Sequence, residues 1–269
     1  MAPETYTHGH HSSVLRSHRW RTAENSAAYL LGHLRPGLDL LDVGCGAGTI
    51  TVDLAQRVAP GMVAAVDSAP AAVAATKSAA DAVGVALAVE PADAYHLPFG
   101  DDSFDVVHAH QVLQHLGDPV AALAEWRRVC RRGGIVAVRD ADYAAMSWWP
   151  LDVRLDRWLE LYSQAARANH GEPDAARHLL GWAGAAGFAV DAIQVSASAW
   201  CFATPGDRGW WADTWAERVT SSALAEQLTT TGLSTAAELA GIADAWRQWA
   251  VAADGWFAVV HGELICSVG

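Results

Sequence analysis

The stretch Leu-Leu-Asp-Val-Gly-Cys-Gly-Ala-Gly-Thr at residues 40–49 decides the fold of this chain. It overlaps a short apolar run at 38–43, typical of a buried strand, and it leads into residues 49–58, whose apolar side chains recur on one side of a helix. Glycines permit a tight turn and let a ligand approach the backbone, because no Cβ intervenes. The N-terminus of the following helix offers N–H groups and a positive dipole end to an anionic group. By itself, the stretch predicts a strand–loop–helix unit for a nucleotide-like ligand.

Outward from this unit, strand and helix patterns alternate. We predict further strands at 62–66, 85–89, 104–108 and 135–139, and helices at 69–83 and 120–129. Such alternation indicates a mostly parallel sheet with helices on both faces. A helix at 22–34, ended by Pro36-Gly37, precedes the first strand.

The second half of the chain has a different composition. Eleven of the thirteen tryptophans lie at or beyond Trp148. We predict helices at 151–169 and 175–186, a sixth strand within 188–203, several helices in 205–254 and a last strand at 256–266. The chain thus divides into an N-terminal segment (1–36), a core (37–146) and a part that completes the sheet (147–269). Residues 205–252 are predicted to form a helical lid, and the whole to be one compact domain.

Two carboxylates sharpen the interpretation of the glycine-rich stretch. Asp42 precedes the glycines, where it can accept from a ligand's ammonium group, directly or through water. Asp67 closes the next strand, at the spacing of a carboxylate that accepts both hydroxyls of a ribose. A dinucleotide dehydrogenase is the alternative, but its fingerprint requires a third glycine where Thr49 stands, and Asp42 would repel a pyrophosphate.

Four motifs resemble those of the class I S-adenosylmethionine (SAM)-dependent methyltransferases, in particular the ubiquinone/menaquinone-biosynthesis-like (type 11) branch. They are LLDVGCGAGT (40–49), VDSAP (66–70), DAYHLPFGDDSFDVVHAHQVLQHLGDP (93–119) and RRGGIVAV (131–138). The resemblance implies an α/β fold, Rossmann-like and doubly wound, with a seven-stranded, mostly parallel sheet whose last strand is antiparallel. It also implies SAM as methyl donor and S-adenosylhomocysteine as product. We expect no metal, because the sequence shows no compelling cluster of metal ligands.

The resemblance carries over to particular residues. It implies that the SAM-binding residues are Asp42, Gly44, Cys45, Gly46, Asp67, Ser68, Asp93, Ala94 and His110, joined by Tyr6 and Arg21 from an N-terminal segment folded over the site.

Catalytic and acceptor-binding residues are less strongly indicated. His110, Asp140 and Asp142 follow or end strands at the expected active-site edge, and one of them could be a general base. The two acids could equally be loop acids or helix caps, and Arg139 could pair with one of them. Five tryptophans are candidates for an aromatic acceptor pocket. They are Trp148, Trp149, Trp210, Trp211 and Trp256, the last because an antiparallel final strand would begin at the active-site edge.

Bulk properties narrow the function further. The net charge of −12 argues against a nucleic-acid partner, and no apolar stretch is long enough to span a membrane. The scattered cysteines favour free thiols in the cytoplasm. We therefore expect a methyltransferase that acts on an O, N or C atom of a small hydrophobic or aromatic molecule, with a homo-oligomer left open. A SAM-binding enzyme of other chemistry, such as a cyclase, and a non-catalytic SAM-binding module are the alternatives.

Overall fold

A computed structural model describes residues 17–269 and contains a seven-stranded sheet in the order β3-β2-β1-β4-β5-β7-β6. The strands are β1 (Leu40–Val43), β2 (Val63–Asp67), β3 (Ala88–Pro91), β4 (Phe104–His110), β5 (Cys130–Trp149), β6 (Ile193–Phe202) and β7 (Trp256–Ser267). β7 runs antiparallel to both of its neighbours, whereas the other pairs are parallel. This arrangement confirms the predicted Rossmann-like α/β fold.

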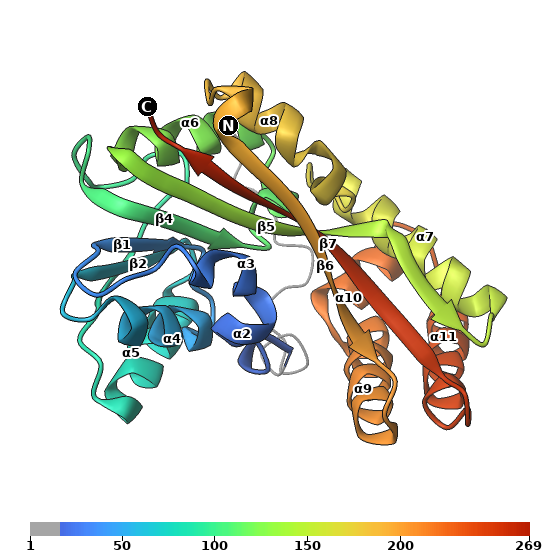
Figure 1. Cartoon of the computed structure of the whole chain (residues 1–269). Coiled ribbons are helices and arrows are strands. Elements are labelled where there is room, and N and C mark those ends of the chain that lie inside the picture. The colour runs from blue at the N-terminus through green and yellow to red at the C-terminus, as the bar shows by residue number, and fades with distance from the viewer. Residues whose placement is uncertain (1–16) are drawn as a thin grey trace.

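Helices cover both faces of the sheet (Figure 1). The helices are α2 (Ala23–Ser26), α3 (Ala28–Leu31), α4 (Thr49–Val58), α5 (Pro70–Val83), α6 (Pro119–Val129), α7 (Val153–Ala168), α8 (Leu179–Ala185), α9 (Pro205–Ser221), α10 (Ala223–Thr230) and α11 (Ala236–Ala250). Successive residues of β1 show why two layers are needed. Leu40 packs into a core with α2 and α4, and Leu41 packs into another with α6 and α8. Because neighbouring strand residues point to opposite faces, an all-apolar strand requires helices on both sides.

The chief departure from the predicted fold is the length of β5. The strand was expected to end at Arg139, but it continues to Trp149 and pairs with β7 along most of that length, with a register irregularity between Asp142 and Ser147. With β6 and β7 it extends the sheet beyond the ends of the parallel strands, and α7, α9 and α11 pack against this extension (Figure 1). Apolar residues on the extension, such as Phe257, and tryptophans of the helices, such as Trp158, build a separate core there.

The predicted helix at 22–34 is interrupted in the structure. It forms two short helices, α2 and α3, separated at Ala27. Thr22 and Asn25 cap α2 reciprocally, and the carbonyl oxygen of Asn25 accepts a hydrogen bond from Trp200 Nε1 at 2.6 Å. A tertiary contact thus takes a carbonyl that a continuous helix would use itself. Within residues 17–269, no helix is both long and apolar enough to cross a membrane.

Candidate active site

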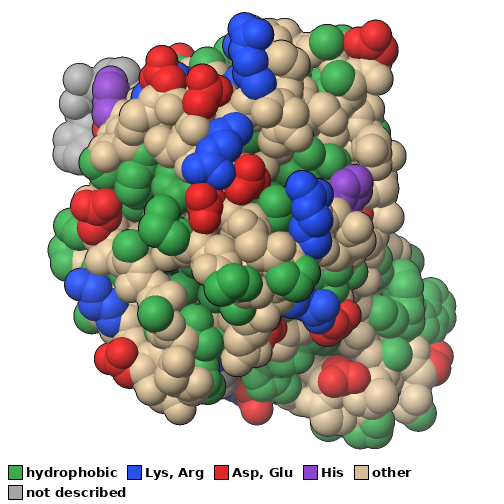
Figure 2. All heavy atoms as spheres, turned by 60° about the vertical axis from the view of Figure 1, so that its left-hand side comes forward, with side chains coloured by type: hydrophobic (Ala, Val, Ile, Leu, Met, Phe, Trp, Pro, Cys, Tyr) green, Lys and Arg blue, Asp and Glu red, His purple; other side chains and the backbone are tan. Residues whose placement is uncertain are grey.

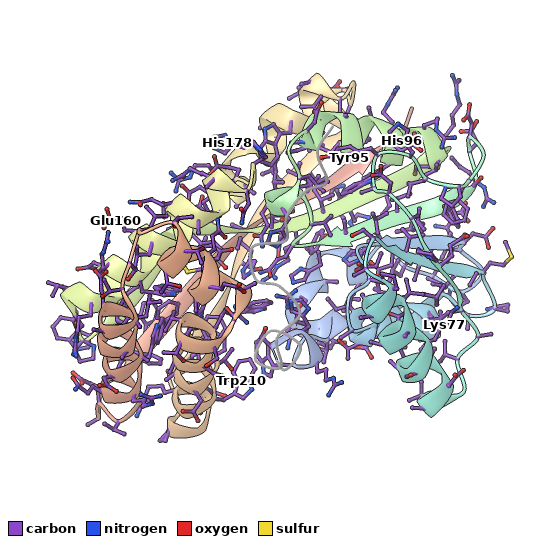
Figure 3. The ribbon with its side chains drawn as sticks, turned by 180° about the vertical axis from the view of Figure 1, so that it is seen from behind. Lys77, Tyr95, His96, Glu160, His178 and Trp210 are labelled. Atoms are coloured by element: carbon purple, nitrogen blue, oxygen red, sulfur yellow. The ribbon has the colours of Figure 1, made fainter. Side chains whose placement is uncertain are left out.

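A cavity of about 380 Å³ lies at the carboxyl ends of β1, β2 and β4 and reaches across to α9. This is where ligands bind in open parallel sheets, because the strand order reverses beside β1. The glycine loop lines one part of the cavity, and tryptophans line another. In the view from behind, Trp210 projects from α9 toward the half of the molecule that carries β1 and β2 (Figure 3).

The glycines of the loop have different reasons to be glycine. Gly44 has a φ of 72°, and a Cβ there would lie 2.4 Å from Val112 Cγ2. Gly46 has a φ of 57°, but its Cβ would meet nothing closer than His18 Nδ1 at 3.7 Å. Gly44 is therefore required by packing, whereas Gly46 leaves open space at the cavity wall. A ligand that approaches the backbone closely fits this space.

Asp42 lines the cavity but is already engaged within the protein. One carboxylate oxygen accepts a hydrogen bond from Thr51 Oγ1 at 2.5 Å, and the other lies 2.7 Å from His108 Nδ1. Asp42 and His108 are both buried. Asp42 therefore ties β1 to β4 and α4, a role that the sequence did not reveal. Each oxygen keeps a second acceptor position for a ligand.

Asp67 and Asp93 follow the next two strands and line the same cavity. Asp67 ends β2, and its two oxygens accept from the backbone N–H groups of Gly46 (3.0 Å) and Ala69 (2.9 Å). Asp93 follows β3 and is exposed, with Oδ1 accepting from Tyr95 N at 2.9 Å. Both acids line the cavity, as do Ser68 and Ala94. The wall thus offers carboxylates to the hydroxyl or amino groups of a ligand.

Cys45 also lines the cavity, but its thiol is not a nucleophile. Burial, with nearby Asp42, raises the pKa of Cys45 to about 12, so the thiol stays neutral. Its sulfur accepts a hydrogen bond from Thr76 Oγ1 at 3.3 Å. Cys45 therefore serves as a small apolar wall residue.

His110, at the end of β4, is a buried imidazole that lines the cavity. Neither ring nitrogen has a hydrogen-bond partner among residues 17–269. Burial, reinforced by the positive charge of Arg21, holds the pKa of His110 well below its usual range. A neutral imidazole is both a donor and an acceptor, so His110 can hold a polar atom of a ligand.

Next to His110, a chain of hydrogen bonds joins β4, β7 and the N-terminal segment. His261 Nδ1 donates to the Val259 carbonyl (3.0 Å), which leaves His261 Nε2 to accept from Gln111 Nε2 (2.8 Å). Gln111 Oε1 in turn accepts from Arg21 Nη2 at 2.6 Å. Gln111 has a φ of 55°, unusual for a residue other than glycine. This chain fixes Arg21 at the cavity wall, and only the tertiary structure reveals Gln111 and His261 as its supports.

The structure does not bring Asp140 and Asp142 to the cavity, although both were candidates for a general base. Asp140 is fully buried, and its Oδ1 accepts from Gln114 N at 3.1 Å. Asp142 forms a double hydrogen bond with Arg177, at 2.6 and 2.7 Å. The expected pairing of Arg139 with one of these acids is wrong, because its ion pair forms with Glu263 at 3.1 Å.

Two of the five candidate tryptophans, Trp210 and Trp211, line the cavity. Trp148 is buried instead and stacks on Phe257, with ring centroids 5.7 Å apart. Trp149 and Trp256 pair across β5 and β7 and are 52% and 39% exposed. At the active-site edge of the sheet, Arg139 of β5 lies opposite Glu263, near the end of β7. The start of β7, which carries Trp256, therefore lies far from that edge. The expectation that Trp256 begins at the active-site edge is therefore wrong.

Other aromatic residues line the cavity without having been singled out as acceptor-binding candidates from the sequence. They are Trp20, Tyr95, Tyr143, Trp200 and Trp215. Trp20 packs against Trp200 and Trp210, with ring centroids 5.2 and 5.3 Å apart, and so joins the N-terminal segment to β6 and α9. Of the predicted lid at 205–252, only residues of α9 reach the cavity, whereas α11 contributes Trp246 to the core of the sheet extension. Tyr6 lies outside the described residues.

Within residues 17–269, the surface charges and the side chains that commonly bind metals do not point to a second site. On the face shown in Figure 2, acidic and basic side chains are interspersed. Among the described residues, ion pairs such as Arg128–Asp101 (2.7 Å) and Arg131–Asp39 (3.0 Å) join oppositely charged side chains. In the part of the chain that the structure describes, no three His, Cys, Asp or Glu side chains gather to hold a metal ion.

Comparison with known proteins identifies the family. Residues 41–138 match the model of a methyltransferase domain. An uncharacterized methyltransferase of Schizosaccharomyces pombe is 35% identical over 97% of this chain and 95% of its own length. A probable methyltransferase of Aspergillus luteorubrus is 28% identical over 97% and 96%.

A solved structure shares the fold. Phosphoethanolamine N-methyltransferase 2 of Haemonchus contortus, in complex with S-adenosyl-L-methionine, superposes with a TM-score of 0.59 over 91% of this chain and 53% of that one, at 18% identity. The motif at the cavity, the sheet order and the match along nearly the whole of a relative agree, and the chain belongs to the class I SAM-dependent methyltransferases.

Proposed function

We propose that the protein transfers a methyl group from SAM to an O, N or C atom of a small hydrophobic or aromatic molecule. The observation that carries this proposal is the continuity of the cavity. Its wall runs from the glycine loop, Asp67 and Asp93 to Trp210 and Trp211 of α9. A cavity of this kind can hold a polar donor and an apolar acceptor in contact.

The residues of the acidic wall suit the polar parts of SAM. Asp67, which ends β2 at the cavity wall, accepts the ribose hydroxyls, and Gly46 admits the ligand to the backbone. Asp93 and Ala94 border the base. When bound, SAM supplies a methyl group activated by the positive sulfonium, so the protein needs to supply alignment and to exclude water.

The aromatic side of the cavity excludes water from the reacting groups. Trp20 contacts both Trp200 and Trp210, and all three line the cavity. His110 lies between the two walls, and its neutral imidazole can hold the acceptor's nucleophilic atom by a hydrogen bond. Its lowered pKa makes it a weak base, which suits orientation better than strong proton abstraction.

Isothermal titration of SAM into the purified protein tests the donor site. Asp67→Asn is expected to weaken SAM binding more than tenfold, because charge-assisted hydrogen bonds to the ribose are lost. Asp81→Asn removes an exposed carboxylate from α5 with the same change of net charge and is expected to bind as the wild type does. Equal affinities for the two variants would contradict the assignment of Asp67.

Detection of S-adenosylhomocysteine tests the reaction itself. Panels of phenolic, carboxylic and heteroaromatic acceptors are incubated with protein and SAM, and the product is measured by mass spectrometry. Acceptor-dependent S-adenosylhomocysteine supports methyl transfer. A transformed acceptor that keeps its mass while SAM is not consumed would instead favour a cyclase or another isomerising enzyme.

A further inference from the structure

Gln111 is a cavity residue whose backbone is unusual for its place in the chain. It directly follows β4, and its φ of 55° lies in the left-handed region that few residues other than glycine adopt. Its backbone N–H donates to the Arg139 carbonyl of β5 at 2.7 Å, which holds this conformation in place. A backbone conformation that costs free energy persists only where its surroundings impose it, and such residues cluster at binding sites.

The left-handed backbone decides on which side of the sheet the Gln111 side chain lies. Along a regular strand, consecutive side chains point to opposite faces, so Gln111 would point away from His110. In the structure both lie against His261. The His110 ring stacks on the His261 ring, with centroids 6.2 Å apart, and Gln111 Nε2 lies 2.8 Å from His261 Nε2. Two consecutive side chains are thus brought together at the cavity wall.

The hydrogen bonds of Gln111 fix the orientation of its amide. An arginine only donates, so Arg21 Nη2, at 2.6 Å, contacts the amide oxygen. His261 Nδ1 donates to the Val259 carbonyl, so His261 Nε2 accepts from the amide nitrogen of Gln111. That nitrogen carries two hydrogens, and among residues 17–269 it makes no other hydrogen bond. The second hydrogen is therefore a donor for a ligand in the cavity.

His110 supplies a second hydrogen-bonding position beside Gln111. Both residues line the cavity, and neither nitrogen of the buried His110 ring has a partner among residues 17–269. Trp200, also at the wall, lies 5.7 Å from the His110 ring and 4.4 Å from the His261 ring, centroid to centroid. This place combines a fixed N–H donor, an imidazole that can donate or accept, and a flat apolar surface.

We infer that Gln111 selects the acceptor, by donating its second amide hydrogen to a carbonyl oxygen that lies beside the atom to be methylated. The inference deepens the proposed methyl transfer and rests on it for the assignment of this side of the cavity to the acceptor. His110 then holds the nucleophilic atom, and a flat apolar body lies against Trp200. A carbonyl oxygen accepts without bringing a hydrogen that would oppose the Gln111 amide. A group without a lone pair leaves that N–H unpaired, which weakens binding.

Two probes of the same shape test the inference. 2-Acetylnaphthalene carries a C=O group where 2-isopropenylnaphthalene carries C=CH2. Each is titrated into protein saturated with S-adenosylhomocysteine, with tryptophan fluorescence as the readout. The measured quantity is the ratio of the two dissociation constants, compared between wild type and variants, so that the difference in hydration between the probes cancels.

Gln111→Met keeps the length of the side chain and removes its donor. We expect this variant to weaken binding of the ketone about fivefold relative to the alkene, the size of one lost neutral hydrogen bond. Gln56→Met, at an exposed position of α4, is the matched control and should keep the wild-type ratio. An unchanged ratio in Gln111→Met would overturn the inference.

His261→Phe tests whether His261 positions Gln111. The substitution keeps a ring beside His110 but removes the nitrogen that accepts from the Gln111 amide. We expect the preference for the ketone to fall about threefold, while the affinity for the alkene stays within about twofold of the wild type. Equal losses for both probes would contradict the positioning role, because a merely structural effect does not distinguish C=O from C=CH2.

The two proposals can fail separately. SAM affinity, measured by calorimetry on each variant, reports the donor site and the integrity of the fold. Normal SAM binding with the same probe ratio in wild type and Gln111→Met would overturn only the inference about the acceptor. Absence of SAM binding in the wild type would overturn the proposed function first.

Discussion

Asp140 is a fully buried carboxyl group whose ionisation should make stability depend on pH. Burial is the largest cause that raises its pKa, to about 7, against the lowering effects of the Gln114 and Leu113 backbone N–H groups and of nearby arginines. Asp140→Asn keeps the shape of the side chain and its acceptor for Gln114 N, which Asp140 Oδ1 contacts at 3.1 Å, but cannot ionise. The substitution therefore isolates the cost of burying the charge.

The sign follows from proton binding in the two states. Between the unfolded pKa, about 4, and the folded pKa, about 7, the folded state holds the proton more tightly. Wild-type stability is therefore lost as the pH rises from about 4 to about 7, and the loss levels off above pH 7. At about 1.4 kcal/mol per pKa unit, the contribution of Asp140 falls by about 2.5 kcal/mol between pH 5 and pH 8.

Urea unfolding followed by tryptophan fluorescence measures this contribution. The free energy of unfolding is determined for the wild type and Asp140→Asn at pH 5 and pH 8, and the variant is expected to gain about 2.5 kcal/mol relative to the wild type over that interval. Other titrating groups are common to both proteins and cancel in the comparison. Asp191→Asn, at an exposed site, controls for net charge. Parallel pH dependences of wild type and Asp140→Asn, within about 0.5 kcal/mol, would refute the reasoning.

Two further sets of substitutions test the loop and the buried ion pair. Gly46→Ala should abolish SAM binding and lower the free energy of unfolding by about 1–2 kcal/mol, because alanine is strained in a left-handed backbone. In thermal unfolding, Gly48→Ala should be less stable by about a further 1–3 kcal/mol, because its Cβ would lie 2.6 Å from Thr76 Cα. Equal destabilisation of the two would contradict the packing argument. Glu263→Gln should lower stability by about 3–5 kcal/mol in urea unfolding, because it leaves the 1% exposed Arg139 without its counter-charge, and a change below 1 kcal/mol would show that the pair is not needed.

The glycine loop and its flanking elements could be predicted from the sequence because their signals are local. The helix at 49–58 has the same bounds in the structure as in the prediction, and the strand before it differs only at its start. Alternating strands and helices were enough to predict the parallel sheet, and the motifs indicated the antiparallel last strand. Asp67, Asp93 and Gly46 line the cavity because each ends a strand of that sheet or lies within three residues of a strand end.

The aromatic side of the cavity, where we propose that the acceptor binds, could not be predicted in the same way. Whether Trp148 or Trp256 reaches the site depends on how far β5 and β7 run past the sheet edge, and that is set by pairing between residues more than a hundred positions apart. The partners of Asp42 and Arg139 depend on contacts of the same kind. The sequence by itself determined the proposed donor site, through backbone geometry and strand ends. Only the tertiary structure decided which aromatic and charged side chains from the second half of the chain face this site. The reason is that burial and strand register are properties of the assembled sheet.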